Sequence, residues 1–72
     1  MEVLVKFTAA EKAAEAKREH AMRVRVYGRW VDAGRMTREA ADRKIALMHE
    51  IAQEYAAQAE AEKARAAPML PL

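Results

Sequence analysis

The chain has 72 residues, a formal net charge of +2 and no cysteine, which excludes disulfides and thiolate metal sites. Its two histidines are the only remaining nitrogen ligands of the kind that soft metals prefer. One domain of this length buries a small hydrophobic core, so we expect a second chain to supply part of its stability.

The composition favours helices. Two glycines and two prolines are too few for the many turns of an all-β fold, whereas alanine, glutamate, lysine and arginine are frequent. No apolar run approaches the length of a membrane span, and Met1 is not followed by a basic segment and a long apolar core. We therefore expect an all-α protein of the reducing cytoplasm, with no membrane partner.

A short extended arm is predicted at residues 1–7, and the first helix follows it. In T-A-A-E, the hydroxyl of Thr8 can accept the amide of Glu11 while the Glu11 carboxylate accepts the amide of Thr8. This arrangement is a capping box, a frequent helix start. No proline occurs between residues 8 and 33, and apolar or small side chains recur there at nearly helical spacing. A helix is predicted over about residues 8–33.

The stretch M-R-V-R-V-Y, residues 22–27, alternates like a strand. A strand here would have no partner of similar pattern, whereas in a helix Val24 and Val26 extend apolar rows that begin earlier in the chain. Gly28 would cost about 1 kcal/mol inside that helix relative to alanine. We predict a helix, in which a glycine is tolerable if another helix crosses closely at that point.

Gly34 predicts the end of the first helix, because glycine readily adopts the left-handed conformation that closes a helix. Thr37 predicts the start of the next one, with Glu39 in its first turn and Met36 placed to fold onto the helix as a hydrophobic staple. The connection, residues 34–36, is so short that the two helices should pack as an antiparallel hairpin.

The second helix is predicted over residues 37–66 and carries apolar residues at alternating steps of four and three, a heptad pattern. Leu47 and Ile51 widen this stripe beyond what one neighbouring helix covers. We therefore predict a homodimer, a four-helix bundle of two hairpins, with residues 8–67 as the hairpin domain and 68–72 as a flexible tail. The predicted dimer seam consists of Ala41, Ile45, Met48, Ala52 and Tyr55.

Catalytic and metal-binding motifs are missing from the sequence. His49-Glu50 begins a zinc-protease motif, but Gln53 stands where the second histidine should be. Serine and cysteine are absent, and both Thr8 and Thr37 are explained as helix caps. We therefore expect neither an enzyme nor a cofactor or metal protein.

Charge is unevenly distributed along the chain. Residues 17–44 carry nine basic and four acidic side chains, whereas both flanking regions are slightly acidic. This pattern fits an anionic partner, or two solvated faces that pair across a dimer. For nucleic acid, the candidate phosphate contacts are Arg18, Arg25, Arg29, Arg35, Arg38, Arg43 and Lys44. A helix-turn-helix at the connection is disfavoured, because its helices are short and a third normally completes its core.

The pattern M-R-V-R-V-Y-G-R-W-V-D-A-G-R-M-T, followed by A-D-R-K-I-A-L-M and I-A-Q-E-Y, resembles small uncharacterised helical proteins of proteobacterial phages and prophages. The similarity spans about residues 8–55. It implies a phage or prophage setting and assigns no functional residues.

These observations lead to two hypotheses about function. The first is a non-enzymatic protein that binds a host or phage protein as a regulator, inhibitor or accessory factor. The second is a nucleic-acid-binding accessory protein that uses the basic centre. The candidate partner-binding residues are Arg25, Arg29, Trp30, Arg35 and Arg38, because arginine and tryptophan often dominate interface energies. An alternative is that Trp30 closes the end of the hairpin and the arginines pair with Asp32, Glu39 and Asp42.

Overall fold

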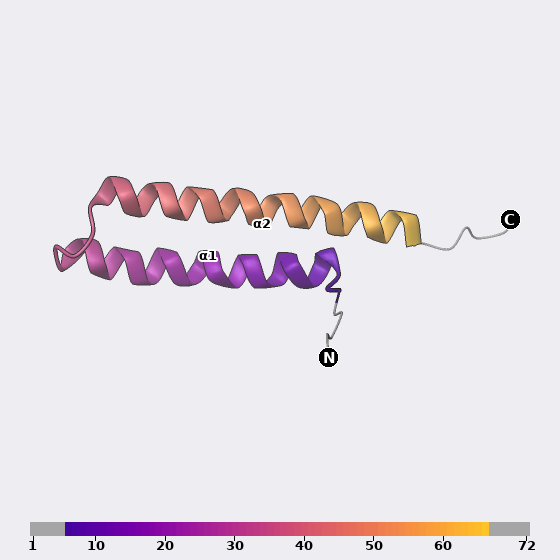
Figure 1. Cartoon of the computed structure of the whole chain (residues 1–72), viewed down its shortest axis with the longest axis horizontal. Helices are drawn as coiled ribbons and strands as arrows, with labels where there is room; N and C mark the ends of the chain where they lie inside the picture. Colours follow the sequence, from indigo (N-terminus) through magenta and orange to yellow (C-terminus); the bar gives the residue numbers. More distant parts are fainter. Residues whose placement is uncertain (1–5, 67–72) are drawn as a thin grey trace, which may run out of the picture.

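The computed structural model of the chain describes residues 6–66. Two helices, α1 (Ala9–Asp32) and α2 (Arg38–Ala66), lie antiparallel and side by side, joined by a short connection (Figure 1). No strand occurs within residues 6–66. The predicted all-α helical hairpin is therefore confirmed. The tail predicted at 68–72 and most of the arm predicted at 1–7 lie outside the described residues.

The capping box at the start of α1 is present. The backbone N–H of Glu11 donates to the Thr8 hydroxyl at 3.1 Å, and the backbone N–H of Thr8 donates to the Glu11 carboxylate at 3.0 Å. These hydrogen bonds from the Thr8 backbone and side chain lower the pKa of Glu11 below its ordinary value, because they stabilise the carboxylate form. Two backbone donors at the helix start thus gain side-chain partners.

Residues 22–27 are helical, as predicted, and α1 continues without a break through Gly28 to Asp32. No close crossing occurs at Gly28 within the described residues. A β-carbon placed on this glycine would meet no atom within 4 Å in the described part of the chain. The glycine therefore lowers helix stability without permitting a closer approach of α2.

The connection between the helices, residues 33–37, is called the elbow below. Gly34 adopts the left-handed conformation with φ of 75°, and its N–H donates to the Val31 carbonyl at 3.0 Å. The N–H of Arg35 donates to the Trp30 carbonyl at 2.8 Å, which completes a Schellman motif. At the start of α2, the Thr37 hydroxyl accepts the Ala40 N–H at 3.1 Å. Both predicted caps are confirmed, and they fix the backbone on either side of the turn.

The core of the hairpin is small. Among the described residues, the buried side chains are Ala9 and Ala16 on α1 and Ala41 and Met48 on α2. Because three of the four are alanines, little apolar area leaves water, and the two broad faces of the hairpin stay open. At its open end, the backbone N–H of Ala9 donates to the Glu62 carboxylate at 3.3 Å, which links the start of α1 to the end of α2.

The heptad stripe of α2 faces α1. Ala41 is 2% exposed and Met48 9%, and the other predicted seam residues, Ile45, Ala52 and Tyr55, are half-buried. Since α1 is the only other helix in the described chain, it is α1 that covers this stripe. The stripe forms the contact within one hairpin. The sequence also predicted that this stripe packs against a second copy of the chain. That dimer contact stays a prediction.

Candidate functional site

The four arginines predicted to bind a partner surround the elbow. Nine residues, two and a half helical turns, separate Arg25 from the buried Ala16, so Arg25 lies on the side of α1 that points away from α2. Arg29 follows one turn later. Arg35 lies in the elbow and Arg38 is the first residue of α2. All four side chains are exposed. We call these four residues the basic elbow.

None of the basic-elbow arginines is neutralised by a neighbouring carboxylate within residues 6–66. The ion pairs in this part of the chain join Arg18 to Glu15 and Arg23 to Glu19. The alternative in which the elbow arginines pair with Asp32, Glu39 and Asp42 is therefore wrong for the described residues. Four guanidinium groups, each with several donors, are left facing solvent.

Trp30 lies at the edge of the basic elbow. Its ring stacks on that of Tyr27, with 5.4 Å between the ring centroids and 27° between the planes. Tyr27 is half-buried, whereas Trp30 is 42% exposed, so Trp30 does not simply close the end of the hairpin. The indole is held on one side and open on the other. Its backbone carbonyl also anchors Arg35, which couples the two residues in space.

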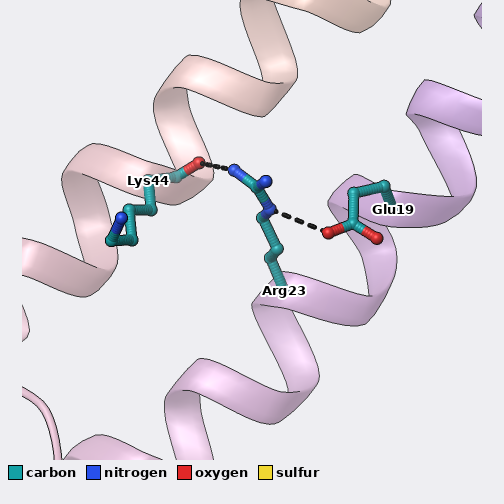
Figure 2. Close-up of polar contacts among 3 residues, drawn as sticks. All are labelled: Glu19, Arg23 and Lys44. Carbon is teal, nitrogen blue, oxygen red and sulfur yellow. Dashed lines mark hydrogen bonds and ion pairs between the residues drawn. The ribbon is translucent and has the colours of Figure 1, made fainter.

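Arg23 is not among the residues predicted to bind a partner, and it lies at the contact between the helices. Figure 2 shows its guanidinium between the helices: Nη1 donates to the backbone carbonyl of Lys44 at 3.0 Å, and Nε donates to Glu19 at 3.1 Å. Two signals were available in the sequence. Arg23 stands four residues after Glu19, a spacing typical of helical ion pairs, and continues the seven-residue interval from Ala9 to Ala16. Arg23 thus joins the two helices.

A second relationship that the sequence did not indicate is the pairing of the two histidines. His20 on α1 and His49 on α2 approach to 5.1 Å between ring centroids. They line a shallow groove of about 390 Å³ whose other walls are mainly alanine. Among residues 6–66, no third histidine, aspartate or glutamate joins them to form a metal-binding cluster. Two imidazoles alone are fewer ligands than a structural zinc site uses.

Comparison with protein-family models, with curated proteins and with solved structures gave no match for this chain. Within the described helices there is also no segment long and apolar enough to cross a membrane. The functional conclusion therefore depends on the basic elbow and on the chemistry of its side chains.

Proposed function

We propose that the chain is a small non-enzymatic binding protein that uses its basic elbow to bind another protein, of a host cell or a phage, as a regulator, inhibitor or accessory factor. One observation carries this proposal. Four exposed arginines without ion-pair partners in the described chain lie in the last turns of α1, in the elbow and at the start of α2, and the half-exposed Trp30 lies in the same segment. The phage or prophage setting is part of the same proposal and is supported by the sequence resemblance alone.

The chemistry of the elbow specifies the kind of surface it fits. A guanidinium binds a carboxylate through two parallel hydrogen bonds, so the partner should present aspartate or glutamate side chains. The open side of Trp30 requires an apolar recess beside them. Arginine and tryptophan together are typical of the few residues that dominate binding energy.

The backbone of the elbow is held in place before any partner binds. The Schellman motif ends α1, and the Thr37 cap starts α2. Because the turn is fixed on both sides, the cost of ordering it on binding is small. Only the arginine side chains remain to be ordered.

The experiment is a pull-down from nuclease-treated lysate of the host, with bound proteins identified by mass spectrometry. We compare the wild-type chain with an Arg29→Ala, Arg35→Ala double variant. The matched control is Lys17→Ala with Arg18→Ala, which removes the same charge from exposed positions away from the elbow. The proposal expects one acidic protein that is recovered by the wild type and the control and is lost with the elbow variant. Equal recovery by all three chains would place the site elsewhere.

Nucleic acid is the second candidate, because the same arginines, together with Arg43 and Lys44, offer phosphate contacts on exposed surface. Binding through four phosphates must weaken by about 100-fold between 50 and 200 mM salt, whereas a carboxylate-rich protein interface with an apolar centre depends less on salt. A gel-shift complex with this steep salt dependence would favour the second candidate. A pull-down without nuclease that recovers nucleic acid alone would overturn the first.

A further inference from the structure

Exposed apolar side chains gather on one broad face of the hairpin. A shallow groove of about 360 Å³ runs along this face, lined by Glu15 and Glu19 of α1 and by Met48, Ile51 and Tyr55 of α2. Met22 and Val26 follow Glu19 at steps of three and four residues, so they lie on the same side of α1. Along α2, Leu47 precedes Ile51 by one turn. We call this surface the methionine face: Glu15, Glu19, Met22 and Val26 of α1, with Lys44, Leu47, Met48, Ile51 and Tyr55 of α2.

Large apolar residues on the methionine face remain in contact with water. Met22 is 40% exposed and Leu47 52% exposed, and Val26 and Ile51 beside them are half-buried. The opposite face, which carries the His20–His49 groove, is mainly alanine with polar side chains. On this opposite face, Val24 is an exposed large apolar residue. It follows Lys17, which lines the groove, by two helical turns. The apolar surface is therefore concentrated on one face of the hairpin.

We propose that the methionine face binds a second copy of this chain, with the two hairpins antiparallel, so that the elbow of each lies over the open end of the other. The small core makes association favourable, because four buried side chains remove little apolar surface from water. A two-fold axis makes the same face meet itself, so one patch serves both copies. The result is a four-helix bundle in which α1 packs on α1 and α2 on α2.

Charge complementarity selects the antiparallel arrangement. Arg43 borders the methionine face in its elbow half, and Glu54 borders it on the same edge of α2 in its open half, three turns away. A two-fold axis that crosses the helices at mid-length brings each basic residue over the acidic residue of the other copy. If the hairpins lay elbow on elbow, their basic ends would repel one another.

This dimer goes beyond the proposed function, because it places two basic elbows at opposite ends of one particle. In this dimer, the heptad stripe of α2 still packs against α1 of its own chain. Met48 and Tyr55 belong to that stripe and also line the groove, so they contact the second copy as well. Failure of the dimer leaves the elbow site of each chain intact, so the two proposals fail separately.

Light scattering of the purified chain during gel filtration tests the association. At about 100 µM we expect twice the chain mass of 8.1 kDa. Leu47→Glu should give the monomer mass, because it places a charge in the centre of the interface. The matched control is Val24→Glu on the opposite face, with 50% exposure against 52% for Leu47, and it should remain a dimer. A monomeric wild type, or dissociation by Val24→Glu instead of Leu47→Glu, would overturn the proposal.

A cysteine cross-link tests the orientation independently of the charge variants. The chain has no cysteine, so an introduced thiol has no competitor. Leu47 lies near mid-length of the hairpin, where the two-fold axis brings it close to Leu47 of the second copy. Leu47→Cys should therefore form a covalent dimer on mild oxidation, whereas Val24→Cys should not. A cross-link through Val24→Cys alone would contradict the arrangement.

Discussion

The guanidinium of Arg23 donates to the main-chain carbonyl of Lys44, and this hydrogen bond ties the middle of α1 to α2 (Figure 2). The same side chain is oriented by Glu19 one turn earlier on α1. With 22% exposure the Arg23 side chain is well shielded from water, unlike the Arg18–Glu15 pair, whose side chains are 70% and 72% exposed. A polar contact thus contributes to a hairpin whose apolar core is small.

Replacing Arg23 by alanine should lower the free energy of unfolding by about 1 to 2 kcal/mol, because a charge-assisted hydrogen bond between the helices is lost. Urea denaturation followed by circular dichroism measures this change. Arg18→Ala serves as the control and should cost less than about 0.5 kcal/mol, since exposed ion pairs contribute little. Equal losses in the two variants would mean that the Arg23–Lys44 contact does not hold the helices together.

Gly28→Ala should stabilise the chain by up to about 1 kcal/mol, because alanine favours the helix and its methyl group meets no other atom. Gly34→Ala should instead destabilise it by roughly 1 to 2 kcal/mol, because an L-residue is strained in the left-handed conformation with φ of 75°. Thermal unfolding of both variants checks the pair. A destabilising Gly28→Ala would reveal a close contact at this position that the hairpin alone does not make.

Stability should depend on the ionisation of Glu11. The pKa of this carboxyl is lowered below its ordinary value in the folded chain by hydrogen bonds from the Thr8 backbone and hydroxyl. A lowered folded pKa means that the capping interaction contributes fully above the unfolded pKa and is lost as the pH falls through the folded pKa. The melting temperature of the wild type should therefore exceed that of Glu11→Gln at neutral pH, and the difference should shrink as the pH falls below the ordinary pKa of a glutamate. A difference that stays constant from neutral to acidic pH would contradict the role of the carboxylate.

Trp30 can be separated from the arginines by comparing stability with binding. Trp30→Ala should lower both the melting temperature and the affinity for the partner, because the indole stacks on Tyr27 and is also 42% exposed. The Arg29→Ala, Arg35→Ala variant should lower affinity alone, since both guanidinium groups lie in solvent. If Trp30→Ala lowers the melting temperature but leaves the affinity for the partner unchanged at a temperature where the variant is folded, the indole belongs to the fold and the site depends on charge.

The sequence predicted those features that depend on a few neighbouring residues. The caps at Thr8, Gly34 and Thr37 are local hydrogen-bonding motifs, so their positions and the hairpin they imply could be predicted from the chain. The contacts between helices could not. A heptad stripe has the same appearance whether it meets a helix of its own chain or of another, and the pairing of His20 with His49 depends on a register that the elbow geometry sets.

The predicted binding residues illustrate the same limit. Their clustering around the elbow follows from their positions near Gly34, and the sequence was sufficient to predict it. Whether each arginine has a carboxylate neighbour depends on side-chain directions on two helices. Helical spacing places Arg23 on the same side of α1 as Ala16 and Arg25 on the opposite side, but the Lys44 carbonyl that Arg23 meets depends on the register of the two helices.

If the basic elbow binds an acidic protein surface, replacing two of its arginines should weaken the binding of the purified partner. Isothermal titration of the protein recovered in the pull-down should give an affinity for Arg29→Ala, Arg35→Ala about 30-fold weaker than for the wild type, since two interface arginines together contribute about 2 kcal/mol. The Lys17→Ala, Arg18→Ala control should stay within about threefold of the wild type, because exposed charges outside an interface contribute little. Equal affinities for the two double variants would contradict the account.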